Sequence, residues 1–177
     1  MTEATEQDKK FMRRCIELSQ KALNKGDQPF GSLIVKDGKI IAEAENDKIK
    51  RKNNHAEILA MNKAQDVLGT DDLSGCTLYT NCEPCPMCSF MIREYKIKKV
   101  VFAVPSPFMG GYSRWKILQD KILGKFPTWF SKTTEVIPNV LEDEARKVYD
   151  GTPLGFVFGS KAKKKKFHLF QSTQVES

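Results

Sequence analysis

The chain contains 177 residues, of which 40% are hydrophobic and 29% are charged, and it carries a formal net charge of +7. This length suits one domain with a substantial core, and the composition is typical of a soluble globular protein. No run of eighteen apolar residues is present, which excludes a helical membrane span, and the polar, acidic start at residues 1–6 does not resemble a secretory signal. We therefore expect a cytoplasmic protein with reduced thiols.

The positive charge is concentrated near the C-terminus, where residues 161–166 have the sequence Lys-Ala-Lys-Lys-Lys-Lys. A run of this kind is usually a solvated tail, and attachment to nucleic acid is the alternative. No linker composition divides the rest of the chain. We predict a single domain at residues 1–160 and a basic tail at residues 161–177.

The N-terminal part of the chain predicts one helix and a β-hairpin. Apolar residues recur at helical spacing between residues 6 and 25, which indicates an amphipathic helix. Residues 30–36 and 39–44 have the composition of two strands, and Asp37 and Gly38 between them are a strong signal for a tight turn.

A polar loop at residues 45–54 leads directly into the next helix, predicted at 55–68. Asn53 or Asn54 can cap the start of that helix. A short strand follows at residues 77–80. The loop therefore delivers the chain to the first turn of a helix.

A second helix is predicted at residues 84–95, because Pro84 and Pro86 suit a helix start, where a missing amide hydrogen is harmless. The apolar run at 100–104 is typical of a buried strand. The alternation of strands and helices predicts an α/β fold, a three-layer α/β/α sandwich around a mixed, mostly five-stranded sheet.

The pattern weakens beyond residue 105. A short helix at 115–123, an edge strand at 135–137 and a helix at 141–149 capped by Asn139 are the predicted elements. No element is predicted from residue 151 onward.

Three residues have the chemistry and spacing of metal ligands. His55 supplies an imidazole, and Cys85 and Cys88 supply two thiols on one face of a first helical turn. Nitrogen and sulfur donors of this kind are preferred by zinc, and a set of three leaves the fourth position for water, as in catalytic sites. Five cysteines, three of them within residues 82–88, favour metal binding over a disulfide framework.

Glu57 lies two residues after the histidine, in the same predicted helical turn. Hydrolytic deamination of an aromatic ring requires a hydroxide, a proton on the ring nitrogen and a proton on the departing amine. Zinc supplies the first by lowering the pKa of its water to about 7. A carboxyl group that is not a ligand can carry the protons. We therefore predict Glu57 as the catalytic acid and base of a zinc hydrolase.

The sequence His-Ala-Glu at residues 55–57, followed by Pro-Cys-Pro-Met-Cys at 84–88, resembles the signature of the cytidine deaminase superfamily. The resemblance covers residues 11–104. It implies a cytidine deaminase-like fold, one Zn²⁺ per chain and hydrolytic removal of an exocyclic amine. Residues 29–31 are similar to guanine, cytosine and tRNA adenosine deaminases, whereas 80–85 resemble the guanine deaminase-like branch.

The same resemblance implies several contacts to substrate and to a partner. Asn46 matches an asparagine that bonds the base or ribose, and the amide of Ala56 would hold the base. Phe30 is a candidate wall on which the base stacks, with packing in the core as the alternative. A homodimer is also implied by the resemblance.

Two interpretations of the substrate remain open. The first is a free aminopurine such as guanine, or cytosine or a nucleoside. The alternative is a tRNA-specific adenosine deaminase in which the basic tail and the loop at 45–54 hold RNA. The C-terminal region lacks the Phe-Asp-Asp segment of bacterial guanine deaminases, and the loop at 105–115 differs from that of the tRNA enzymes.

Two other classes of function are also compatible with parts of the pattern. Cys82 could complete a closed, purely structural zinc site with four protein ligands. A degenerate deaminase fold could serve only for binding, although the presence of Glu57 argues against that interpretation. The positions of Cys82 and Glu57 relative to the metal ligands distinguish both alternatives from a catalytic site.

Overall fold

The computed structural model describes residues 3–161, so the predicted basic tail, apart from Lys161, lies outside the described residues. Within this range the chain forms one mixed five-stranded sheet in the order β2-β1-β3-β4-β5. The strands are β1 Gly31–Lys36, β2 Lys39–Glu45, β3 Cys76–Cys82, β4 Lys99–Val104 and β5 Glu135–Ile137. Strand β1 is antiparallel to β2 and β3, whereas β3, β4 and β5 are parallel to one another.

The predicted hairpin between β1 and β2 is confirmed. Asp37 and Gly38 both adopt positive φ, 50° and 72°, which is the backbone of the turn that matches the twist of a two-residue hairpin. This turn fixes the antiparallel register that pairs Lys36 with Lys39.

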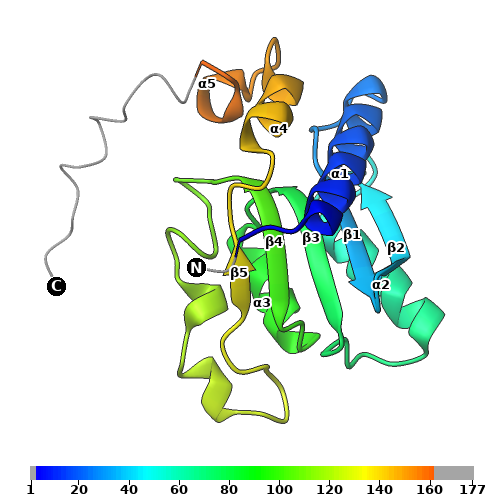
Figure 1. Ribbon diagram of the computed structural model, residues 1–177, viewed down its shortest axis with the longest axis vertical. Coiled ribbons are helices and arrows are strands. Elements are labelled where there is room, and N and C mark those ends of the chain that lie inside the picture. The colour runs from blue at the N-terminus through cyan, green and yellow to red at the C-terminus, as the bar shows by residue number, and fades with distance from the viewer. Residues whose placement is uncertain (1–2, 162–177) are drawn as a thin grey trace, which may run out of the picture.

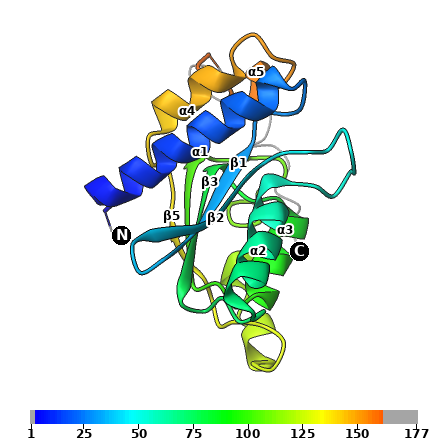
Figure 2. The same ribbon diagram turned by 90° about the vertical axis from the view of Figure 1, so that its right-hand side faces the viewer.

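Helices cover both faces of the sheet, which confirms the predicted three-layer sandwich (Figures 1 and 2). Helices α1 and α4 lie on one face, and α2 and α3 lie on the other. A short helix, α5, follows α4. The bounds are α1 Glu6–Asn24, α2 Ala56–Leu68, α3 Pro86–Glu94, α4 Glu142–Tyr149 and α5 Gly155–Phe158.

The core is divided by the sheet into two halves, and the strand sequences explain why. In β4, Val100 and Phe102 point into the half shared with α2 and α3, whereas Val101 and Ala103 point into the half shared with α1 and α4. Successive side chains of a strand face opposite sides. A strand that is apolar at successive positions is therefore buried on both faces, as β4 is from Val100 to Val104.

Three predicted local features are wrong. The first is the helix at 115–123, where the chain instead forms two 3₁₀ turns, Ile117–Gln119 and Leu123–Lys125. The fully buried guanidinium of Arg93 donates to the carbonyl oxygens of Ile117 and Ser131, each at 2.7 Å. The long connection from β4 to β5 is thus shaped by contacts with α3 and not by helical periodicity.

The other two errors concern helix caps. Asn139 does not cap α4, because Leu141 occupies the cap position without a side-chain bond and Asn139 itself adopts a φ of 64°. Likewise, His55 is the cap residue of α2, and neither Asn53 nor Asn54 caps it. The amide of Ala56 instead donates to Asn46 Oδ1 at 2.9 Å, so the first turn of α2 is capped from ten residues upstream.

No helix within residues 3–161 is both long enough and apolar enough to cross a bilayer.

Candidate active site

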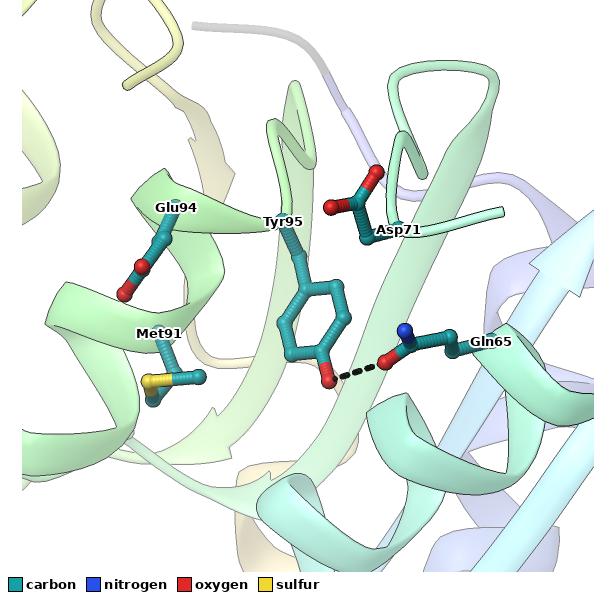
Figure 3. A pocket seen from close by; sticks show the side chains of 5 residues that line it. All are labelled: Gln65, Asp71, Met91, Glu94 and Tyr95. Carbon is teal, nitrogen blue, oxygen red and sulfur yellow. Dashed lines mark hydrogen bonds between the residues drawn. The ribbon is translucent and has the colours of Figure 1, made fainter. Parts of the chain in front are cut away.

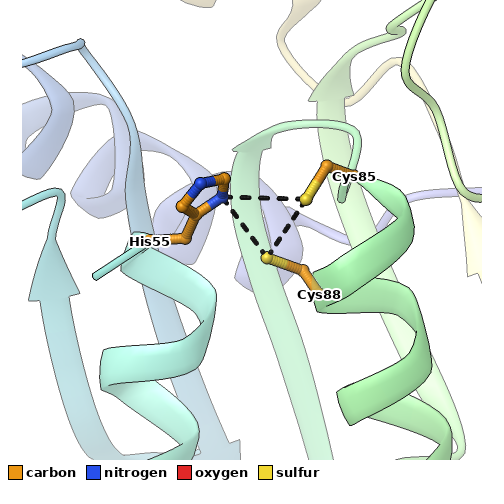
Figure 4. Close-up of side chains that lie close together, drawn as sticks. All are labelled: His55, Cys85 and Cys88. Atoms are coloured by element: carbon orange, nitrogen blue, oxygen red, sulfur yellow. Dashed lines mark hydrogen bonds between the residues drawn. The ribbon is translucent and has the colours of Figure 1, made fainter. Parts of the chain in front are cut away.

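The starts of two helices bring the three predicted ligands together. His55 immediately precedes α2, Cys85 immediately precedes α3, and Cys88 lies in the first turn of α3. The Nδ1 atom of His55 is 3.7 Å from the Cys85 sulfur and 3.6 Å from the Cys88 sulfur, and the two sulfurs are 3.6 Å apart. Figure 4 shows the three side chains converging on one point from the two helix ends.

The chemistry of this donor set fits zinc. A hydrogen bond from Cys88, together with the nearby His55, lowers the pKa of the Cys85 thiol to about 4 and therefore favours a thiolate. Thiolate sulfur and imidazole nitrogen are the donors that zinc prefers, and these three atoms are close enough to share one ion. The positive end of helix α3 also favours negative charge at this position.

Cys82 does not complete a closed four-ligand site. Among the described residues, the group able to hold a metal consists of His55, Cys85 and Cys88. Cys82 is the last residue of β3, and its thiol is buried, which raises its pKa well above the usual value. The described residues therefore supply three ligands to a metal that prefers four. Three protein ligands are typical of catalytic zinc sites, where the fourth position binds water or substrate.

Glu57 is buried in the first turn of α2, on the same cavity wall as His55 and Cys85. Burial, followed by the negative charge of Cys85, raises the pKa of its carboxyl group to about 7. It is not a member of the ligand group. A buried carboxyl group thus lies beside the ligands without being one of them.

A cavity of about 290 Å³ opens above these residues. We call His55, Glu57 and Cys85, which line the cavity, together with the neighbouring ligand Cys88, the pocket floor. The remaining lining residues, which we call the pocket rim, come from five different segments of the chain. They are Gln28, Phe30, Lys48, Cys82, Glu83, Ser106, Met109, Leu154 and Phe158.

The three residues implied as substrate contacts occupy different positions. Phe30 lines the cavity. Asn46 and Ala56 are buried behind it and bond to each other, so the Ala56 amide hydrogen is already used. The Asn46 Nδ2 atom, in contrast, has no hydrogen-bond partner in the described part of the chain.

Glu83 is a rim residue that sequence reasoning missed. Its buried carboxylate accepts hydrogen bonds from the amides of Ser106, Tyr112 and Ser113 and from the Ser113 hydroxyl, at 2.6–3.0 Å. The loop approaches so closely that a Cβ atom added at Gly110 would overlap the Glu83 carboxylate. One carboxylate thereby anchors the loop after β4 next to the cysteine motif.

Helix α5 supplies a second part of the rim that was not predicted. Phe158 packs edge-on against Phe30, with ring centroids 6.3 Å apart, and both rings also contact Tyr149. Tyr149 is fully buried, and its hydroxyl accepts a hydrogen bond from Asn81 at 2.8 Å. The aromatic cluster at the pocket is therefore built from the segment before β1 and from the helices α4 and α5.

Three aromatic residues of the long connection from β4 to β5 do not line the cavity. Trp115 and Trp129 are 54% and 63% exposed, and neither lines it. Trp115 is instead covered on one side by the guanidinium of Arg114. Nor does Phe130 line it.

A second cavity, of about 170 Å³, lies between the C-terminal parts of α2 and α3 (Figure 3). Its lining includes Tyr95, whose hydroxyl donates to Gln65 at 2.8 Å, and the acidic residues Asp71 and Glu94. It contains no residue of the pocket floor. We assign no chemistry to it.

Comparison with known proteins identifies the class to which this site belongs. The family of the cytidine and deoxycytidylate deaminase zinc-binding region matches residues 5–104, and the chain belongs to this family. It is a zinc-dependent hydrolytic deaminase of the cytidine deaminase superfamily.

Two curated relatives and one solved structure define the similarity more closely. The chain is 37% identical to the tRNA-specific adenosine deaminase of Bacillus subtilis over 164 residues, which cover 90% of this chain and 94% of that protein. It is 45% identical to the guanine deaminase of the same organism over 97 residues, or 52% of this chain and 62% of that protein. A structure from a study of A-to-I editing by tRNA:A34 deaminases at the wobble position superposes with a TM-score of 0.70 and 26% identity, covering 78% of this chain and 98% of the other.

Proposed function

We propose that this protein deaminates adenosine to inosine in tRNA. The observation that carries the proposal is the extent of similarity across the pocket. A match over 90% of the chain necessarily includes every lining residue from Gln28 to Phe158. A match over 52% of the chain is shorter than that span, so the similarity to guanine deaminase cannot cover the whole rim.

This proposal replaces the first interpretation of the sequence, a free aminopurine such as guanine, with its alternative. The motif at residues 80–85, which resembles the guanine deaminase branch, covers the end of β3 and the cap residue of α3. It contributes Cys85 to the floor and Cys82 and Glu83 to the rim, and the other seven rim residues lie outside it. Floor residues perform a reaction that these deaminases share. Substrate choice depends on the shape and contacts of the rim.

The pocket floor would perform the chemistry. His55, Cys85 and Cys88 hold zinc, which when bound supplies a nucleophilic water at neutral pH. Glu57 would take a proton from the attacking water and deliver it to the ring nitrogen N1, and it would then take the second proton from the new hydroxyl group on C6 and deliver it to the departing amine. Water is consumed, the C6–N bond breaks, ammonia leaves, and the 6-oxo base of inosine remains.

The rim would bind the target base. Phe30 and Phe158 offer aromatic surfaces at the cavity, on which a base extruded from the RNA can stack. Asn46 is not a rim residue, because its side chain is buried and does not line the cavity, so a contact between its unpartnered Nδ2 and the base stays a prediction. The Ala56 amide does not serve as a base contact in this arrangement, because it already donates to Asn46.

Deamination of free guanine is the second candidate, supported by the higher identity, 45%, to the B. subtilis guanine deaminase within the matched region. An ammonia-release assay separates the two. The zinc-loaded protein is incubated with a tRNA carrying adenosine at position 34, with the same tRNA carrying guanosine there, and with free guanine, adenosine and cytidine. Nucleosides from the tRNA are then analysed by mass spectrometry.

We expect ammonia and one inosine per tRNA from the adenosine-34 transcript, and neither from the guanosine-34 control. Ammonia release from guanine, with both tRNAs unchanged, would overturn the proposal in favour of the second candidate.

A further inference from the structure

Lys48 is the cation of the pocket rim. It belongs to the loop between β2 and α2 and lines the cavity, where its Nζ atom donates to the side-chain oxygen of Gln28 at 2.9 Å. Both partners are rim residues, and Gln28 is exposed, so the ammonium group lies toward the solvent side of the pocket. The base of an aminopurine is uncharged and does not itself require a cation at this place.

The loop that carries Lys48 is held in a defined conformation. Asp27, buried near the end of α1, accepts the amide hydrogen of Ile49 at 3.0 Å. Asp47 bonds through its amide to the Asn54 carbonyl, and its own carbonyl accepts from Lys50 and Arg51. Lys48 is therefore presented at the rim by an ordered turn.

In the described part of the chain, the basic residues of this loop form no ion pairs, unlike those of the nearby helix. On α1, Arg14 pairs with Glu43 at 2.6 Å, and Lys21 pairs with Glu45 at 3.2 Å. Within residues 3–161, by contrast, no carboxylate lies at ion-pair distance from any basic residue of the loop, and Lys48 bonds to a neutral amide. These basic residues are Lys48, Lys50, Arg51 and Lys52.

A half-buried cation without an acidic partner is available to bind an anion that arrives with the substrate. We propose that Lys48, held in position by its hydrogen bond to Gln28, binds the phosphate adjacent to the target nucleotide at the mouth of the pocket. The inference rests on the proposed function, and it names a phosphodiester as the ligand of this part of the rim. Lys48 would thereby help the enzyme to recognise a nucleotide within a strand.

The test removes the charge of Lys48 and the charge of the RNA phosphate separately, and then removes both. A tRNA anticodon stem-loop with the target adenosine is prepared with natural linkages and with a neutral methylphosphonate at either linkage flanking the target. Lys48→Met removes the charge at similar length, and Lys48→Arg retains it. Lys50→Met removes a charge from the same loop outside the cavity lining, and Lys39→Met removes one at the hairpin end of β2.

We expect Lys48→Met to raise the dissociation constant for the natural RNA about tenfold, as for one charge-assisted hydrogen bond. The slope of log K against log salt should fall by about 0.7, as for one phosphate contact on a single strand. One of the two methylphosphonate RNAs should have a dissociation constant about tenfold higher than the natural RNA for the wild-type protein. The Lys48→Met variant should bind that RNA and the natural RNA with the same dissociation constant. Lys50→Met should affect natural and neutral RNAs alike, and Lys39→Met should affect neither.

Three results would overturn the inference. The first is equal behaviour of Lys48→Met and Lys39→Met on the natural RNA. The second is that the loss of binding from Lys48→Met adds to the loss from each methylphosphonate. Lys48 would then act through the overall positive charge of the protein and not through contact with one phosphate. The third is failure of Lys48→Arg to restore binding.

Failure of the proposed function has a different signature. The wild-type protein would then form no inosine in any of the RNAs, whatever the residue at position 48. Zinc content and thermal stability, measured for every variant, identify any loss that arises from misfolding.

Discussion

The pocket floor and the pocket rim are built in different ways. The floor uses residues at the starts of two helices, α2 and α3, where the backbone itself fixes the spacing of the ligands. The rim uses five segments spread from Gln28 to Phe158, and their positions depend on long-range packing. We therefore expect the floor to determine the reaction and the rim to determine which substrate can reach it. Substitutions should separate these two roles.

The largest effect is expected from removing a ligand. Cys88→Ala deletes one of three donors, and we expect loss of zinc together with activity at background level. Metal content by plasma emission spectroscopy and turnover on the adenosine-34 tRNA measure both. Cys15→Ala is the matched control, because it removes a fully buried thiol from the opposite half of the core and should retain zinc. Normal zinc content in Cys88→Ala would show that the wrong thiol has been assigned.

The next effect isolates proton transfer. Glu57→Gln keeps the shape of the side chain but cannot carry protons, so we expect turnover to fall by about 10²–10⁴ with zinc retained. Glu17→Gln, at an exposed acid on α1, should change neither quantity. If Glu57→Gln instead lost zinc in proportion to activity, Glu57 would be a ligand and the proposed division of the floor would be wrong.

The sequence was sufficient to predict the floor because short-range rules determine it. Residues His55 and Glu57 share a helical turn, and Cys85 and Cys88 are three apart at a proline-marked helix start. The alternative in which Cys82 is a fourth ligand is not supported, because Cys82 is the last residue of β3 and is not a member of the ligand group. Strand alternation and helix periodicity likewise sufficed for the layers of the fold.

The rim could not be predicted in the same way. Glu83 looks in sequence like any acid next to a proline, and its role emerges only when the loop after β4 folds back onto it. Helix α5 has four residues, too few to show a periodic pattern, yet it contributes Phe158 to the wall. The capping of α2 by Asn46 was missed for the same reason, since the bond spans ten residues of loop.

Glu83 connects the two regions, and its substitution should produce an intermediate effect. Glu83→Gln replaces one acceptor oxygen with an NH₂ group that faces buried donors. We expect the free energy of unfolding to fall by about 2–4 kcal/mol, because one or two buried groups lose their partner. The loop that carries Ser106 and Met109 would loosen, so KM for the tRNA should rise more than kcat falls.

Ser113→Ala is the graded control for Glu83, because it removes only the hydroxyl donor and leaves the three amide bonds intact. Its effect on stability and on KM should be clearly smaller. Urea denaturation and steady-state kinetics measure the two quantities. A Glu83→Gln variant with unchanged KM would show that the rim holds its shape independently of this carboxylate.

The smallest effect is expected at the aromatic wall. Phe158→Leu keeps an apolar side chain but removes the ring that packs edge-on against Phe30 and faces the cavity. Aromatic contacts contribute about 1 kcal/mol beyond their buried area, so KM should rise about fivefold with kcat nearly unchanged. Phe156→Leu is matched to it, since Phe156 lies on the same helix, is 75% exposed and does not line the cavity. Equal KM values for the two variants would mean that α5 closes the pocket without touching the base, and the rim would then act on substrate choice through its other segments.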